Sequence, residues 1–253
     1  MKIALQLWTV RDHTAHDMLG ALRDVARIGY RAVEFAGLGT ASAADVRREL
    51  DALQIEAISA HIALADLLAR RSAVIEELRT LGCRQVVLPW IPAEQRTSLD
   101  QVERLAETCN GLGAALAAED ITFVYHNEDY DFLPLGDSTL WHTLVAHTDP
   151  ALIALQLDLF TAELMGVDPI RLMREYGSRI TSLHVCDMLH RQYVPIGNGE
   201  LPWPVIIATA RATAVEWLIV EQDGSPQSLA DAAASLIHLG RFISECGSLP
   251  LDI

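Results

Sequence analysis

Short apolar runs alternate with amphipathic stretches along nearly the whole chain of 253 residues, and this alternation limits the fold more than any other feature. Eight runs have the length and apolar content of buried strands, and they span residues 3–8, 32–35, 55–61, 85–89, 121–126, 153–159, 180–185 and 217–221. Helical periodicity occupies several of the intervals between them, at residues 17–27, 43–53, 67–81, 99–118 and 229–246. Strands that alternate with helices along the chain predict βαβ units and a parallel sheet.

The number of these units favours a closed barrel over an open sheet. Eight strand–helix repeats in 253 residues match the size of a (β/α)8 TIM barrel. A doubly wound open sheet usually has fewer strands, and no Gly-x-Gly-x-x-Gly sequence follows the first strand. Because no Pro-, Gly- or Ser-rich linker divides the chain, we expect a single domain over residues 1–253.

Charge and composition exclude several classes of function. The 34 acidic residues outnumber the 19 basic ones, and a net charge of −15 disfavours binding to nucleic-acid backbones or anionic membranes. Lys2 is the sole lysine, so the body of the fold has no Schiff-base or phosphate-loop lysine. The four cysteines form no CxxC pair and are expected to be reduced. The chain shows no signal-peptide pattern and no membrane-spanning apolar run, so we expect a soluble, cytoplasmic protein.

Ionisable side chains gather where the predicted strands end. In a parallel barrel the active site lies at the carboxyl ends of the strands. The residues at these ends are Glu34, His61, Trp90, His126 with Glu128, Asp158, His184 with Asp187, and Glu221 with Asp223. Burial of so many charged groups without a countercharge is costly, and carboxylates with an imidazole are typical ligands of Mn²⁺, Mg²⁺, Co²⁺ or Zn²⁺. The pattern therefore predicts a divalent metal site at the barrel rim.

These residues also have plainer interpretations. Asp158 and Glu221 stand among apolar neighbours in strands, where a carboxylate needs a partner, so a structural role alone explains them poorly. His184 taken by itself is equally well explained as a core histidine. Trp8 and Trp90 are better interpreted as core or pocket wall than as chemical groups.

Seven segments follow one another in an order typical of one family. They are ALQLWTVRD at residues 4–12, ISAHIAL at 58–64, FVYHNEDYDF at 123–132, LQLDLF at 155–160, SLHVCD at 182–187, PIGNGELPWPVII at 195–207 and LIVEQD at 218–223. Together they resemble the sugar phosphate isomerase/epimerase family of the xylose isomerase-like TIM barrel superfamily. The third is similar to YHNHxxEF, with Glu128 for the second His and Asp131 for Glu. The fifth resembles HxKD, with Cys186 where Lys is common.

The resemblance implies a metal site on four of the strand-end residues. Carried over by position, its ligands are Glu128, Asp158, His184 and Glu221. The fifth-strand ligand has two candidates, because some relatives place it two residues earlier, at His126. We prefer Glu128 as the ligand, since a carboxylate completes a harder site, and His126 is then a candidate base.

The activity that the resemblance implies is that of a metal-dependent isomerase or epimerase. It would shift a proton on a ketose or keto-sugar through an enediolate, with Glu128, Glu221 and His126 as the candidate catalytic groups. The glycines of segment 196–203 would allow that segment to close over the substrate. The expected substrate-binding residues are His61, Trp8, Trp90, Arg11, Asp187 and Glu34.

Other functions fit the same scaffold. A metal-dependent lyase or dehydratase acting on a keto-inositol or 3-keto-sugar would begin with the same proton abstraction. A non-enzymatic sugar-binding barrel is a third interpretation, and the acidic charge opposes an apurinic-site endonuclease.

We expect a small carbohydrate substrate without phosphate, because only Arg11 and Arg191 lie near the site to replace the missing lysine. The segment PLGDSTLWHTLV fits either a homo-oligomer interface or the outer core of the barrel.

Overall fold

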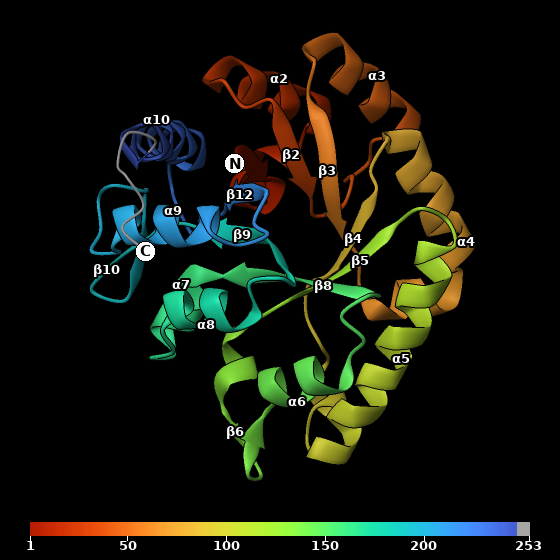
Figure 1. The fold of residues 1–253 in the computed structure, drawn as a ribbon. Coiled ribbons are helices and arrows are strands. Elements are labelled where there is room, and N and C mark those ends of the chain that lie inside the picture. The colour runs from red at the N-terminus through yellow and green to blue at the C-terminus, as the bar shows by residue number, and fades with distance from the viewer. Residues whose placement is uncertain (247–253) are drawn as a thin grey trace.

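Eight parallel strands close into a barrel in the computed structural model, which describes residues 1–246. Around the barrel the order is β1 (Lys2–Gln6), β12 (Trp217–Val220), β9 (Ile180–Val185), β8 (Ile153–Asp158), β5 (Thr122–His126), β4 (Gln85–Leu88), β3 (Glu56–His61) and β2 (Ala32–Phe35). Strand β2 pairs again with β1, which closes the ring (Figure 1). The predicted (β/α)8 TIM barrel is confirmed.

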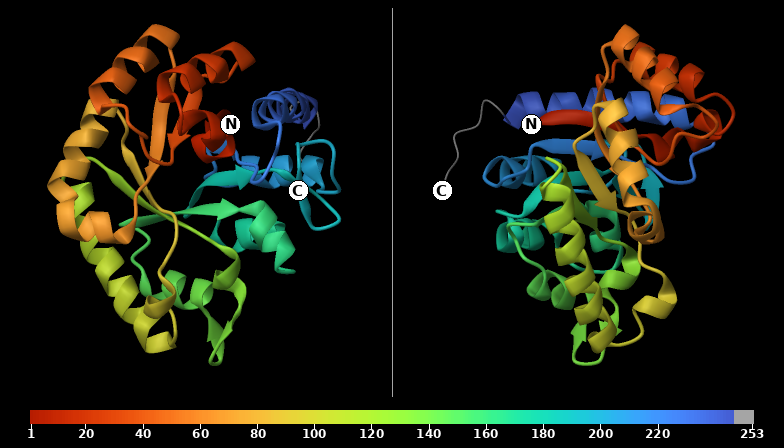
Figure 2. Two further views of the ribbon diagram at one scale, coloured as in Figure 1. Left: turned by 180° about the vertical axis from the view of Figure 1, so that it is seen from behind. Right: turned by 90° about the vertical axis from the view of Figure 1, so that its right-hand side faces the viewer.

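Helices surround the strands on the outside (Figures 1 and 2). They are α1 (Arg11–Thr14), α2 (Met18–Ile28), α3 (Ala43–Leu53), α4 (Leu64–Leu81), α5 (Leu99–Ala117), α6 (Leu140–His147), α7 (Leu159–Leu164), α8 (Pro169–Tyr176), α9 (Trp203–Arg211) and α10 (Ser228–Cys246). Single 3₁₀ turns lie at η1 (Leu7–Val10), η2 (Ala93–Gln95) and η3 (Asp129–Phe132), and two small hairpins at β6 (Pro134–Leu135) with β7 (Ser138–Thr139) and β10 (Asp187–Leu189) with β11 (Gln192–Val194). The helices predicted from periodicity are all present. Helices α1 and α6 to α9 were not predicted, because four to nine residues carry little periodic signal.

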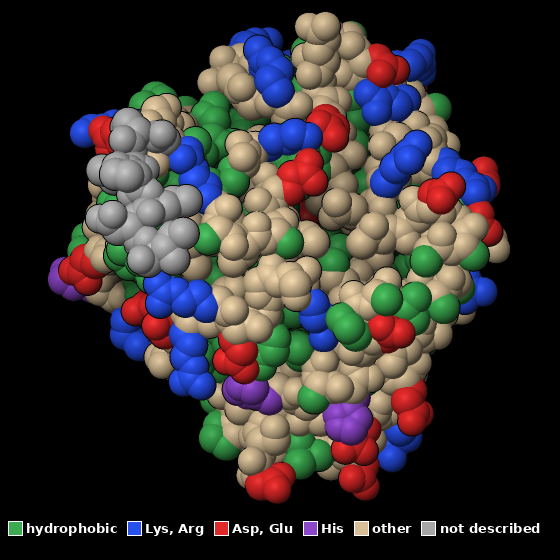
Figure 3. Space-filling model, viewed as in Figure 1, with side chains coloured by type: hydrophobic (Ala, Val, Ile, Leu, Met, Phe, Trp, Pro, Cys, Tyr) green, Lys and Arg blue, Asp and Glu red, His purple; other side chains and the backbone are tan. Residues whose placement is uncertain are grey.

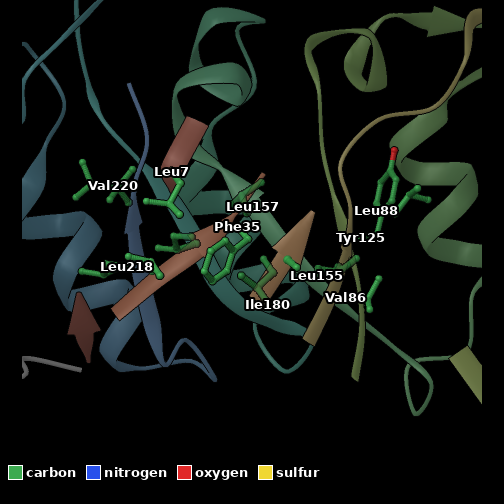
Figure 4. Close-up of a cluster of buried hydrophobic side chains, with 14 of the residues drawn as sticks. Leu7, Phe35, Val86, Leu88, Tyr125, Leu155, Leu157, Ile180, Leu218 and Val220 are labelled. Atoms are coloured by element: carbon green, nitrogen blue, oxygen red, sulfur yellow. The ribbon is translucent and has the colours of Figure 1, made fainter. Parts of the chain in front are cut away.

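The core has two parts that follow from the alternation of side chains along each strand. Between strands and helices, residues such as Phe35, Tyr125, Leu155 and Leu218 are almost fully buried (Figure 4). A second, smaller apolar cluster contains side chains from neighbouring strands of the barrel: Ala4, Ala32, Ile58, Trp217 and Ile219. Gln6, Glu34 and Glu221 stand two residues beyond Ala4, Ala32 and Ile219, so along β1, β2 and β12 this face turns from apolar to polar towards the carboxyl end.

The first strand ends earlier than predicted. Strand β1 stops at Gln6, and the predicted extension to Trp8 is wrong because the Gln6 side chain accepts a hydrogen bond from the Trp8 backbone N–H and starts the turn η1. The turn carries Trp8 out of the sheet, where its side chain is 46% exposed. This places an aromatic ring at the rim of the barrel.

The surface mixes charges of both signs. Figure 3 shows Lys and Arg interspersed with Asp and Glu on the face drawn there. Many of them pair, as Arg23 does with Glu49 at 2.9 Å. Within residues 1–246, no helix is both long and apolar enough to cross a membrane.

Candidate metal centre

A buried carboxylate, Glu34, stands inside the barrel and receives donors from several strands. Its side chain has no exposure to solvent. The nearest donors are Gln6 Nε2 at 2.8 Å, Ser59 Oγ at 2.5 Å, Gln156 Nε2 at 2.8 Å, His184 Nε2 at 2.5 Å and His61 Nε2 at 3.1 Å. Burial alone would raise the pKa of Glu34, but the imidazoles of His61 and His184 hold it well below its usual range. Glu34 is therefore ionised.

His184 connects this carboxylate to the mouth of the barrel. One ring nitrogen, Nε2, faces Glu34, and the other, Nδ1, lies 2.6 Å from Glu221 Oε2. Burial would lower the pKa of His184, yet the charges of Glu221 and Glu34 raise it well above its usual value. The interpretation of His184 as a plain core histidine does not account for two carboxylates at 2.5 and 2.6 Å.

Four side chains at the carboxyl ends of neighbouring strands converge on one point. His126, Asp158, His184 and Glu221, from β5, β8, β9 and the residue after β12, each offer a ligand atom within 4.8 Å of the others. A second group shares two of these residues and adds His61. Among the described residues, the buried Nδ1 of His126 has no hydrogen-bond partner. Two imidazoles and two carboxylates are a suitable donor set for a divalent ion such as Zn²⁺ or Mn²⁺, so these residues fit a metal.

The structure brings together three of the four residues that the sequence predicted as ligands. Asp158, His184 and Glu221 belong to the converging group, and its fourth member is His126, the alternative left open for β5. Glu128 lies beside the group, where it is the N-cap of η3. Burial raises the pKa of Glu128 to about 8, and the charges of Asp158 and Glu221 act in the same direction.

A cavity of about 510 Å³ opens above the converging side chains. Its wall includes His61, His126, Glu128 and Glu221, together with the half-exposed indoles of Trp8 and Trp90. Among the described residues that line it there is no Lys or Arg. The cavity thus combines carboxylates, imidazoles and aromatic faces at the end of the barrel where TIM-barrel active sites lie.

A family model described as xylose isomerase-like TIM barrel matches residues 22–239. The chain belongs to the xylose isomerase-like TIM barrel family. The superfamily indicated by the seven sequence segments is therefore confirmed.

The chain is similar in sequence to one characterised protein and in fold to several solved structures. An inosose dehydratase from Geobacillus kaustophilus (strain HTA426) is 27% identical over 210 residues, and the chain spans 64% of its length while 71% of the chain is matched. A crystal structure of a sugar phosphate isomerase/epimerase from Parabacteroides distasonis ATCC 8503 has a TM-score of 0.83 at 20% identity, covering 96% of this chain and 95% of that one. A crystal structure of the IolI protein with a bound zinc atom has a TM-score of 0.77 at 14% identity, covering 98% and 100%. The two structures share the fold.

Three of the predicted substrate-binding residues, Glu34, Asp187 and Arg11, do not line the cavity. Glu34 is enclosed by the donors described above. Asp187 is fully buried, and its carboxylate accepts hydrogen bonds from the backbone N–H groups of Met188, Gly197 and Leu201 and from the indole N–H of Trp203, at 2.7–3.1 Å. Asp187 therefore fastens the segment that we expected to close as a lid.

The predicted cation at the site, Arg11, also has another partner. Its guanidinium lies over the Trp8 ring, 4.6 Å from the centroid, and pairs with Asp223. Arg191 donates from Nη2 to the Leu164 carbonyl at 2.9 Å. Neither arginine lines the cavity.

Sequence reasoning missed the amides and hydroxyl that surround Glu34. Gln6, Ser59 and Gln156 are buried polar residues on strand faces that point inward. A polar residue two positions beyond a buried apolar one, as Gln6 is beyond Ala4, is the signal that could have found them.

Proposed function

We propose that this protein is a divalent-metal-dependent sugar isomerase or epimerase that moves a proton on the carbon next to a carbonyl group. The observation that carries the proposal is the convergence of four ligand atoms within 4.8 Å beneath a cavity that a further carboxyl group, Glu128, also lines. Burial of so many ionisable groups costs free energy unless a countercharge offsets it, and such clusters are typical of sites that bind a substrate.

The proposed ligands of the ion are His126, Asp158, His184 and Glu221. The unpartnered Nδ1 of His126 supports its inclusion in this set. When bound, a divalent ion supplies the positive charge that stabilises negative charge on a substrate oxygen.

The carboxyl groups of Glu128 and Glu221 would move the proton. Both line the cavity, so an oxygen of one can take the proton from the carbon beside the carbonyl and the other can return a proton to the substrate. His61 Nδ1 is free of the contacts that its Nε2 makes with Glu34 and Gln156, and His61 lines the same cavity, where it would bind a substrate hydroxyl. Trp8 and Trp90 would pack against the C–H faces of the sugar and exclude water.

We further propose that the substrate carries no phosphate. A phosphate group usually needs an arginine, a lysine or a cluster of backbone N–H groups. The cavity wall contains neither basic side chain among the described residues, and Arg11 is already paired with Asp223. An uncharged ketose, keto-sugar or cyclitol ketone suits this wall best.

A dehydratase is the second candidate, and the inosose dehydratase at 27% identity favours it. The first step would be the same removal of a proton beside the carbonyl. The electron pair left on carbon would then form a double bond as a neighbouring hydroxyl departs, and a carboxyl group would give that hydroxyl a proton to release water. The two candidates share their residues and differ only in the fate of the intermediate.

Deuterium exchange tests the proposal and separates the two candidates. The protein, with its metal content measured, would be incubated in D₂O with a panel of uncharged ketoses, 3-keto-sugars and keto-inositols. An isomerase or epimerase gives a product of the same composition with deuterium beside the carbonyl, and a dehydratase gives a product lacking one water. A protein that carries metal but leaves every member of the panel unlabelled and unchanged would contradict the proposal.

A further inference from the structure

Every group in hydrogen-bond contact with Glu34 is a potential donor. Gln6 and Gln156 present amide N–H groups, Ser59 its hydroxyl, and two imidazoles a ring nitrogen each. An ionised carboxylate accepts through both oxygens and donates nothing, so it satisfies all of these groups at once. An amide of the same shape would turn its NH₂ group towards one or more donors. The position therefore requires a carboxylate and not merely a polar side chain.

The Glu34 carboxylate accepts the Nε2 proton of His184, which leaves Nδ1 as the nitrogen that can give up its proton to bind a cation. The Glu34 Oε1 atom lies 2.5 Å from His184 Nε2, and neither side chain is exposed. At this distance in a buried site, the proton of the bond stays on Nε2 and points at the carboxylate. The remaining nitrogen, Nδ1, faces Glu221, which belongs to the converging group.

We propose that Glu34 is a positioning residue of the metal site, which keeps the proton of His184 on Nε2 and so presents Nδ1 to the cation. The proposal rests on the metal site put forward under the proposed function. Carboxylates that accept the second N–H of a metal-bound histidine orient the ring and raise its basicity.

The surroundings of Glu34 hold the ring of His184 in this orientation. The ring of His61 lies parallel to that of His184, with 5.4 Å between centroids and 5° between planes. His61 Nε2 is in turn 3.1 Å from Glu34 and 3.2 Å from Gln156 Oε1. A flipped His184 ring would put a C–H group against the carboxylate, so one buried carboxylate determines the placement of both imidazoles.

The variant Glu34→Gln tests this role, with Ser59→Ala as the matched control. Ser59 donates a hydrogen bond to the same carboxylate, and within residues 1–246 it makes no hydrogen bond to His184. The dissociation constant for Zn²⁺ would be measured by competition with a chelator, without any substrate. We expect Glu34→Gln to weaken Zn²⁺ binding about 10- to 100-fold and Ser59→Ala to change it by less than about threefold. Binding by Glu34→Gln within twofold of the wild type would overturn the proposal.

A second readout needs no variant at the position. In wild-type protein with ¹⁵N-labelled histidine and bound Zn²⁺, long-range nitrogen–proton spectra should show His184 with its proton on Nε2 and the metal on Nδ1. Metal on Nε2 would overturn the proposal even if Glu34→Gln does not fold.

The same spectra separate this inference from the proposed function. If the wild type binds no divalent ion, the proposed function fails, and the spectrum of the metal-free protein still decides the contact with Glu34. A protonated Nε2 that disappears in Glu34→Gln would then support the positioning of the ring by Glu34, and an unprotonated Nε2 in the wild type would overturn it.

Discussion

Glu128 lines the cavity together with His126 and Glu221, but unlike those two residues it does not belong to the converging group of ligands. If it moves the proton, Glu128→Gln should lower the rate of deuterium exchange at the substrate carbon by about 100-fold or more, because an amide cannot take up a proton at this pH. Bound metal should remain. Asp129→Asn is the matched control, since Asp129 is the adjacent carboxylate and lies exposed. Equal exchange by Glu128→Gln and wild type would exclude this role.

Asp131 makes folding stability depend on pH near neutrality. Burial raises its pKa from 3.8 to about 7, although it accepts hydrogen bonds from the Tyr125 hydroxyl and the Glu128 backbone N–H. The folded state therefore binds the proton more tightly than the unfolded state. This stabilisation is complete below the unfolded pKa, near 4, and is lost as the pH rises through about 7.

Asp131→Asn removes this titration and provides the test. Urea unfolding of both proteins at pH 5 and pH 8 should show that the wild type gains about 2–3 kcal/mol over the variant at the lower pH. Since the rest of the chain is common to both proteins, the comparison isolates one carboxyl group. A stability difference that is the same at both pH values would show that Asp131 does not titrate in this range.

Among the elements, the segment from β10 to the start of α9 has four of its N–H groups bound to one carboxylate, that of Asp187. Asp187 receives donors from both ends of this segment, and a Cβ on Gly199 would lie 2.3 Å from its Oδ1. Asp187→Asn should lower the free energy of unfolding by about 2–4 kcal/mol, because the amide cannot accept all of these bonds and some donors stay buried without a partner. Asp223→Asn, at a half-exposed carboxylate, should lower it by less than about 1 kcal/mol in the same urea titration. Equal losses in both variants would contradict this account.

The strands could be predicted from the sequence better than the turns at their carboxyl ends. A buried strand has a period of two, so Asp158 and His184 could be placed on inward faces from their neighbours alone. Glu128 stands beyond the end of β5, where the direction of its side chain depends on the turn η3 and not on that period. Sequence periodicity therefore could not choose between His126 and Glu128. Trp8 was misplaced for the same reason, because a side-chain cap ended its strand.

At the scale of the whole molecule, the barrel's closure produces contacts that no local pattern contains. Glu34 on β2 meets Gln156 on β8 and His184 on β9, which are 122 and 150 residues away. These distances depend on the register of every strand between them. The sequence resemblance compares segments far apart in the chain, and so it could propose His61 and His184 as site residues. Glu34, however, was assigned to the substrate, and its partners Gln6, Ser59 and Gln156 were not predicted.

The central claim is that one divalent cation binds where His126, Asp158, His184 and Glu221 converge at the mouth of the barrel. The most direct test is the number of Zn²⁺ or Mn²⁺ ions bound per chain, measured by elemental analysis after removal of free metal, in the wild type, His126→Asn and Glu128→Gln. We predict about one ion in the wild type and in Glu128→Gln, and loss of the ion in His126→Asn. Loss in Glu128→Gln with retention in His126→Asn would contradict the assignment of the fourth ligand, and absence of the ion from the wild type after incubation with metal would contradict the whole account.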